Sequence, residues 1–247
     1  MRTLAIANAK GGTGKTTTAV TLAHGLALRG QRILLVDADT QGQAARALGL
    51  RPTIGLAEVI AGQTPAKQAL TEARPGLHLL AGGEGLALAK REISRRDVGS
   101  EWVISEALEP LASAFDWAIV DTGPGWDVLT VNAIFASDAV LAPVSLEPLA
   151  LMGLADFARS LEKVQRYHRA PLRWVLPTFA DRRRRQTGEL LDQLRAHYGD
   201  RVCDPIRATV RLSECAAFGR TIFEHDSHGP AAQDYLALIE RITNDAS

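Results

Sequence analysis

The sequence has very little cysteine and no long apolar run, and each absence excludes a class of protein. Its 247 residues include only Cys203 and Cys215, too few for a disulfide scaffold and too far apart for a CxxC pair. The reducing cytoplasm is therefore the expected compartment. No segment approaches the ~20 apolar residues of a membrane span. The first apolar run is too short for a signal peptide, and a glycine loop ends it.

The sequence also lacks an excess of charge of either sign. Lysine plus arginine and aspartate plus glutamate each number 28, so the formal net charge is zero. This balance excludes a globally basic nucleic-acid binder. It does not exclude a local basic patch, because electrostatic attraction depends on how the charges are distributed over the surface.

Apolar runs alternate along the chain with segments of helical periodicity. Strands are expected at residues 4–8, 31–37, 77–80, 117–120, 139–144 and 173–176. Helices are expected at residues 15–29, 102–111, 128–135, 149–167, 187–198 and 230–242. This alternation predicts an α/β fold with a doubly wound, mostly parallel sheet and helices on both faces. No Pro/Gly/Ser-rich linker divides the chain, so one domain over residues 1–247 is expected.

A glycine-rich loop lies between the first expected strand and the first expected helix. It consists of Lys10, Gly11, Gly12, Thr13, Gly14, Lys15, Thr16 and Thr17. Glycines let successive backbone N–H groups point into one concave space, and the following helix adds its N-terminal dipole. The order strand, loop, helix is the context that a phosphate-binding loop requires.

The loop predicts ATP and Mg²⁺ as cofactors. Lys15 can reach the β- and γ-phosphates, and the Thr16 hydroxyl can ligate Mg²⁺. The standard pattern is G-x-x-x-x-G-K-[ST], but Ala9 occupies the first glycine position here and a second lysine, Lys10, follows it.

Carboxylates follow two of the expected strands. Asp37 and Asp39 come at the end of the second strand, and Asp121 ends the apolar run at 117–120. Ligands of parallel α/β sheets bind at the carboxyl ends of the strands. A strand that ends in aspartate has the Walker B form, in which the carboxylate holds Mg²⁺. Asp121 is therefore a candidate metal and nucleotide residue.

These segments resemble the deviant Walker A family typified by ParA/Soj partition ATPases, MinD and the nitrogenase iron protein. The resemblance spans essentially the whole chain and includes VRLSE at residues 210–214. It implies that Lys10 crosses into a partner subunit and contacts its nucleotide, which requires a nucleotide-sandwich homodimer. It also implies that Asp39 positions the attacking water and that Asp37 lies near the magnesium shell. Lys10, Lys15 and Asp39 are thus the expected catalytic residues.

The chain departs from the family pattern at three positions. Thr40 replaces the proline of D-x-D-P-Q-G, and Gly123 replaces a proline after Asp121, which should loosen that loop. Arg207 occupies the position of a family proline that contacts adenine, so Arg207 is expected to bind the nucleotide. Thr178 is also expected to bind it.

An uninterrupted basic run follows Asp181. It consists of Arg182, Arg183, Arg184 and Arg185. The run lies where ParA/Soj proteins place basic residues against DNA, and Arg211 lies in a second such place. Such side chains neutralise phosphates without reading sequence, so non-specific binding to double-stranded DNA is expected. The resemblance further implies a ParB-like partner or other cargo adaptor that stimulates hydrolysis, and nucleoid association of the ATP-bound form.

Three other functions share part of this pattern. A MinD-like membrane cycle needs a basic amphipathic C-terminal helix, and residues 239–247 have too little apolar face for one, so no membrane partner is expected. An iron–sulfur electron carrier needs cysteines in the middle of the chain, whereas Cys203 and Cys215 come late. A ParA-like positioning ATPase for a non-DNA cargo would share every residue discussed, so it stays open.

Overall fold

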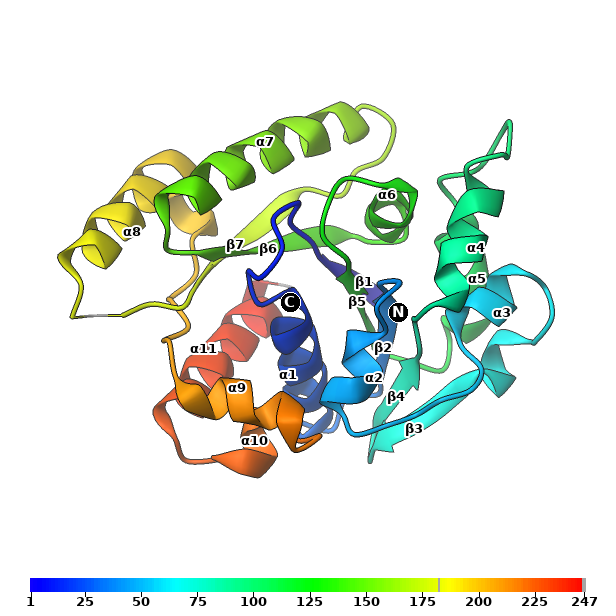
Figure 1. The fold of residues 1–247 in the computed structure, drawn as a ribbon, viewed down its shortest axis with the longest axis horizontal. Helices are drawn as coiled ribbons and strands as arrows, with labels where there is room; N and C mark the ends of the chain where they lie inside the picture. The colour runs from blue at the N-terminus through cyan, green and yellow to red at the C-terminus, as the bar shows by residue number, and fades with distance from the viewer. Residues whose placement is uncertain (182, 246–247) are drawn as a thin grey trace.

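The computed structural model describes residues 1–181 and 183–245. Within these residues a seven-stranded sheet has the order β3-β4-β2-β5-β1-β6-β7 (Figure 1). Neighbouring strands are parallel except for β3, which is antiparallel to β4. The strands are β1 (Arg2–Ile6), β2 (Ile33–Ala38), β3 (Leu70–Arg74), β4 (Leu77–Leu80), β5 (Trp117–Thr122), β6 (Ala139–Ser145) and β7 (Leu172–Thr178).

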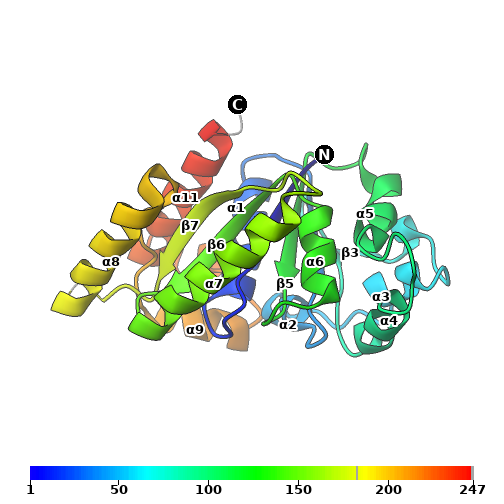
Figure 2. The same ribbon diagram turned by 90° about the horizontal axis from the view of Figure 1, so that it is seen from above.

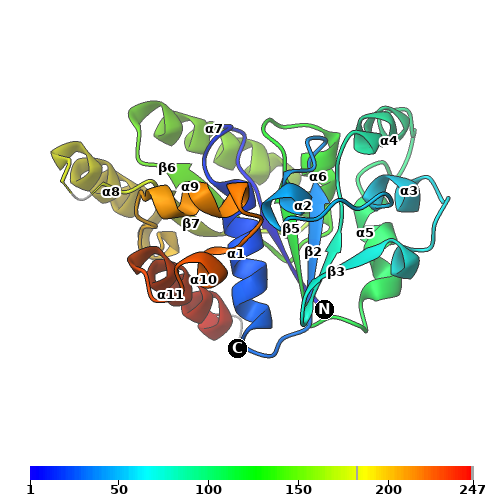
Figure 3. The ribbon, with the colours of Figure 1, turned by 60° about the horizontal axis from the view of Figure 1, so that its bottom comes forward.

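Helices cover both faces of this sheet (Figure 2). They are α1 (Lys15–Ala27), α2 (Gln43–Ala47), α3 (Leu56–Ile60), α4 (Gly85–Ile93), α5 (Val103–Leu108), α6 (Val128–Phe135), α7 (Pro148–Val164), α8 (Arg185–Tyr198), α9 (Val210–Ala217), α10 (Ile222–His225) and α11 (Pro230–Asp245). Single 3₁₀ turns occur at Ala66–Gln68, Glu109–Leu111 and Gly199–Arg201. Figure 3 shows α9, α10 and α11 grouped around α1.

The core forms on both sides of the sheet because successive strand residues point to opposite faces. In β1, Leu4 and Ile6 pack with the side chains of α1 and α11, whereas Ala5 packs with α7. All three side chains are almost completely buried. This two-sided burial explains why the strands read as continuous apolar runs. The predicted doubly wound, mostly parallel α/β fold is confirmed.

The six expected strands all form. Strand β4 has the predicted bounds, the other five have shifted ends, and several elements were missed. The first strand covers Arg2–Ile6, so it starts and ends two residues before the predicted 4–8. Strand β3 was not predicted, because it is a partly exposed edge strand with the polar sequence LTEAR. Helix α9 was missed because it is only eight residues long and Cys215 is its one buried residue, which leaves no apolar run to mark it.

Candidate nucleotide-binding site

The glycine loop leaves β1 and turns directly into α1. Gly12 and Gly14 have φ angles of 71° and 84°, a left-handed conformation that glycine adopts without steric cost. Gly14 is the N-cap of α1 and makes no side-chain capping bond, so the first N–H groups of the helix stay available to a ligand. Thr16 and Thr17 lie in this first turn. The loop therefore presents the donors that an anionic group needs.

The two lysines of the loop have different surroundings. Lys15 is 6% exposed, and its Nζ donates to the carbonyl oxygen of Lys10 at 3.0 Å. Burial lowers the pKa of Lys15, and the negative charges of Asp121 and Asp39 partly oppose this shift. The Nζ of Lys10 instead lies 3.3 Å from Oε2 of Glu147, the residue immediately before α7. About a third of the Lys10 side chain is exposed. Lys15 thus points into the site, and Lys10 points out of it.

The sheet register brings Asp37 and Asp121 together, since they are paired residues of β2 and β5. Both oxygens of Asp37 are already engaged. They accept hydrogen bonds from the N–H groups of Asp39 and Ala44, each at 3.0 Å. Burial raises the pKa of Asp37, and the charge of Asp39 adds to the increase. Asp37 therefore holds the loop that leads to α2, and its place near a metal stays a prediction.

Asp121 is the carboxylate that lacks partners. It is fully buried, and neither oxygen accepts a hydrogen bond from the residues that the structure describes. Burial, and then the charge of Asp37, raise its pKa well above the usual range, while the charge of Lys15 opposes the increase. An unsatisfied buried carboxylate is costly unless a cation or its water is bound.

This chemistry fits Mg²⁺, although residues 1–181 and 183–245 contain no cluster of three or more His, Cys, Asp or Glu side chains that could hold a metal. Mg²⁺ at phosphate sites keeps several waters and uses one or two protein oxygens together with the phosphates. Asp121 and the Thr16 hydroxyl are the residues that would hold it.

Two glycines make room for Asp39. A Cβ added at Gly82 would lie 2.7 Å from the carbonyl oxygen of Asp39, and one added at Gly123 would lie 3.0 Å from its Oδ1. Oδ1 also accepts from the N–H of Gln41 at 3.0 Å. Oδ2 accepts no hydrogen bond within the described part of the chain. Gly123, the departure from the family's proline, thus lets the Asp39 carboxylate lie against the loop after β5.

The loop after β5 is tied to its neighbours at several points. The N–H of Gly125 donates to the carbonyl oxygen of Ala9 at 2.8 Å, which joins this loop to the phosphate loop. Asp127 caps α6 through the N–H of Thr130 and accepts from Lys90 of α4 at 2.6 Å. Sequence reasoning missed Lys90, because nothing in a helical lysine indicates a partner 37 residues away.

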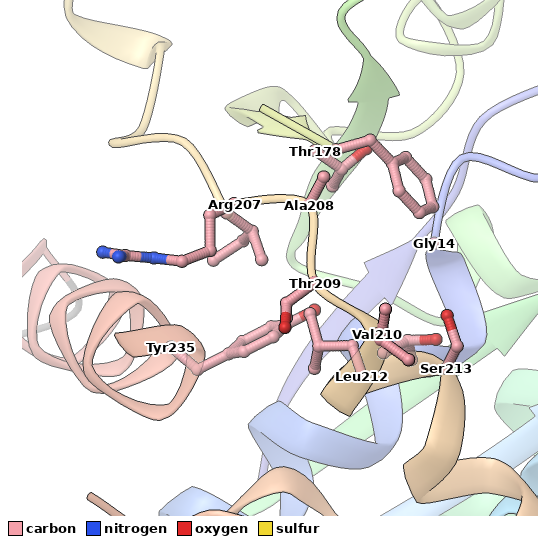
Figure 4. Close-up of a pocket in the computed structure, with 12 residues that line it drawn as sticks. Gly14, Thr178, Arg207, Ala208, Thr209, Val210, Leu212, Ser213 and Tyr235 are labelled. Carbon is pink, nitrogen blue, oxygen red and sulfur yellow. The ribbon is translucent and has the colours of Figure 1, made fainter. Parts of the chain in front are cut away.

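A cavity of about 500 Å³ opens beside Gly14 (Figure 4). Thr178 lines it and donates from its hydroxyl to the carbonyl oxygen of Thr13 at 3.0 Å. Arg207 also lines it, but its guanidinium points away and pairs with Asp234 at 2.7 Å. The other lining residues are Thr17, Phe179, Ile206, Ala208, Thr209, Val210, Leu212, Ser213 and Tyr235. The structure thus brings Thr178 and Arg207 to one cavity next to the loop, and their nucleotide contacts stay predictions.

The predicted DNA-binding arginines lie on the surface. Arg182 lies outside the described residues. Arg183 is exposed, Arg184 lies 3.4 Å from Asp181, and Arg185 lies 2.9 Å from Glu189. Arg211 of α9 lies 3.2 Å from Glu214. These ion pairs are local and exposed, so each contributes about 0–1 kcal/mol and leaves the guanidinium free to exchange partners.

A parallel sheet with a glycine loop at the start of a helix, two lysines and strand-end carboxylates defines a P-loop nucleotide-binding protein of the deviant Walker A type. A family model described as "AAA domain" matches residues 1–174. The chain is 36% identical to the chromosome partitioning protein ParA of Caulobacter vibrioides, covering 98% of this chain and 94% of the relative. It is 37% identical to the chromosome-partitioning ATPase Soj of Thermus thermophilus, covering 98% and 95%.

The chain belongs to the ParA/Soj family of chromosome-partitioning ATPases, which confirms the predicted family and the prediction of an ATPase. Its fold also matches the structure of cobyrinic acid a,c-diamide synthase from Mycobacterium smegmatis, which contains an ATP analog and magnesium. That match has a TM-score of 0.79 and 32% identity, and it covers 94% of this chain and 98% of the other. Within residues 1–181 and 183–245, no helix is both long and apolar enough to cross a membrane.

Proposed function

We propose that this protein is a ParA-type ATPase that binds Mg-ATP, dimerises around two nucleotides and binds DNA without sequence preference. Hydrolysis, stimulated by a ParB-like partner, releases the DNA and drives segregation of a chromosome or plasmid. The observation that carries this proposal is the two-lysine loop beside the buried, unpartnered Asp121 carboxylate. The protein is cytoplasmic, and its ATP-bound form associates with the nucleoid.

The nucleotide step follows from the contacts of the loop. Lys15 exchanges the carbonyl oxygen of Lys10 for phosphate oxygens, because an ammonium–phosphate hydrogen bond is stronger than one to a neutral carbonyl. Mg²⁺ supplies charge neutralisation for the phosphates, with Asp121 and Thr16 on its protein side. Asp39 has one oxygen held by Gln41 and one open, so it can orient a water toward the γ-phosphate.

The dimer step concerns Lys10. Its ammonium extends away from its own phosphate loop to Glu147, and the exposed side chains of Leu149 and Met152 lie in the next turns of α7. An exposed ion pair is a weak contact, so it can be replaced by a stronger one to the phosphates of a second subunit. This supports a nucleotide-sandwich homodimer in which each subunit supplies Lys10 to its partner.

The DNA step is supported by the backbone that joins the arginines to the nucleotide cavity. Ala180 and Arg207 form an isolated parallel bridge, with hydrogen bonds of 3.1 Å from Ala180 to Ile206 and from Ala208 to Ala180. The two bridged segments of the chain leave this bridge in the same direction because the bridge is parallel. One leads to Arg183 and the other to Arg211, so a change at the cavity acts on both basic segments.

Reversing the charge of the basic run tests the DNA step. The triple variant Arg183→Glu, Arg184→Glu, Arg185→Glu should lower affinity for a random 40-base-pair duplex at least ~100-fold at 100 mM salt, since each lost phosphate contact removes about 0.9 from the slope of log K against log salt. ATP-dependent dimerisation should be unchanged. Fluorescence anisotropy and light scattering measure the two properties.

A matched control reverses three exposed charges in the last turn of α7 and just after it. These changes are Lys163→Glu, Arg166→Glu and Arg169→Glu. The control carries the same change in net charge, and it should lower DNA affinity less than ~5-fold because it acts only through the long-range field. Equal losses in both triple variants would place the DNA elsewhere.

A further inference from the structure

The backbone at Phe179 is strained. Its φ angle is 54°, and it is the one non-glycine residue of positive φ within residues 1–181 and 183–245. A bulky side chain in the left-handed region is a genuine outlier. Such strain persists only where surrounding contacts impose it, and it clusters at ligand sites.

The contacts on either side of Phe179 fix this conformation. The residue before it, Thr178, accepts from the N–H of Leu146 at 3.2 Å and donates its hydroxyl to Thr13 at 3.0 Å. The residue after it, Ala180, is held in the parallel bridge with the strand-like segment at 206–208. The chain therefore cannot relax at Phe179 without breaking its attachment to the phosphate loop or to the far wall of the cavity.

The strained backbone directs the phenyl ring toward the loop. A Cβ built at Gly14 would lie 3.9 and 4.0 Å from Cε2 and Cζ of Phe179. The ring thus lies over the N-cap of α1 and forms one wall of the 500 Å³ cavity, whose other walls include Ile206, Val210 and Tyr235. Yet Phe179 is 53% exposed. An aromatic ring that is held in place at a cavity mouth but left half in water gains free energy when a flat apolar group covers it.

We propose that Phe179 is the stacking surface for the nucleotide's purine ring. The proposal rests on the proposed nucleotide site, because the loop at Gly14 places the phosphates and the adjoining cavity then receives the nucleoside. Stacking on an aromatic side chain contributes through the π-face of the base. The left-handed backbone keeps the ring in position before the nucleotide arrives, so little side-chain entropy is lost on binding.

Two ligands separate the ring's role from that of the loop. Calorimetry with Mg-ADP should show that Phe179→Ala binds about 10-fold more weakly, within the range of base–aromatic stacking. Magnesium tripolyphosphate, which has no base, should bind wild type and Phe179→Ala equally. Phe179→Tyr should restore Mg-ADP binding to within about 2-fold, because its ring stacks as well. The control Phe218→Ala removes a phenyl that is 63% exposed at the C-cap of α9 and does not line the cavity, so it should change neither affinity.

The variant Phe179→Gly separates strain from stacking. Glycine adopts positive φ freely, so this variant should melt at a higher temperature than Phe179→Ala but bind Mg-ADP equally weakly. Wild-type affinity for Mg-ADP in Phe179→Ala would overturn the inference while leaving the nucleotide site intact. An equal loss of tripolyphosphate binding would overturn it too, since the effect would then come from the loop. A wild-type protein that binds neither ligand would refute the proposed function itself.

Discussion

Replacing Lys15 with alanine is expected to weaken Mg-ATP binding at least ~100-fold, because it removes the charge-assisted hydrogen bonds that the loop's buried ammonium makes to the phosphates. The ammonium is almost completely buried, which lowers the pKa of Lys15, while the negative charges of Asp121 and Asp39 oppose that shift. Isothermal titration calorimetry with a slowly hydrolysed ATP analogue measures the affinity.

Lys10→Ala is the matched control, since it removes an ammonium from the same loop. The Lys10 side chain points toward Glu147, outside its own site, so the variant should bind the nucleotide as a monomer within about 3-fold of wild type and fail to dimerise. Unchanged ATP affinity in Lys15→Ala would refute the assignment of the phosphate loop. A large loss of monomer affinity in Lys10→Ala would show instead that Lys10 acts within its own subunit.

Replacing Asp39 with alanine should lower the rate of ATP hydrolysis at least ~100-fold, the usual loss when a water-positioning carboxylate is removed. Nucleotide binding should persist, so the variant should accumulate as an ATP-bound dimer. Phosphate release and light scattering in Mg-ATP measure the rate and the dimer.

Asp37→Asn provides the comparison for that experiment. Both oxygens of Asp37 accept backbone hydrogen bonds, and an amide nitrogen cannot accept from the N–H of Ala44 or Asp39. This variant should therefore lose about 1–3 kcal/mol of stability, the cost of a broken buried hydrogen bond, as well as activity. If Asp39→Ala hydrolyses ATP at the normal rate, another group positions the water.

The phosphate loop and the strand-end carboxylates could be predicted from the sequence because each depends on local pattern. The glycines at 12 and 14 have the positive φ angles that the loop requires. The sequence placed Asp37 and Asp121 at strand ends, and the structure adds that β2 and β5 are adjacent and pair the two residues in register. The parallel topology then placed these motifs at one edge.

The parts that sequence reasoning missed depend on contacts between distant segments. The Lys90–Asp127 pair and the Ala180–Arg207 bridge each join residues 27 or more positions apart, with no periodicity to reveal them. The strain at Phe179 arises from its neighbours' hydrogen bonds, and a phenylalanine after a strand has no sequence signal. The Asp39 carboxylate fits because Gly82 and Gly123 lack side chains, which only the folded loops show.

The proposed coupling of nucleotide state to DNA binding is best tested by measuring DNA affinity with Mg-ATP, Mg-ADP or no nucleotide, each at 50 and 200 mM salt. Random-sequence duplex should bind tightly only with Mg-ATP, and the affinity should fall at least ~100-fold between the two salt concentrations, as expected for several phosphate contacts. DNA affinity that is the same in all three nucleotide states would contradict the coupling between the phosphate loop and the basic surface.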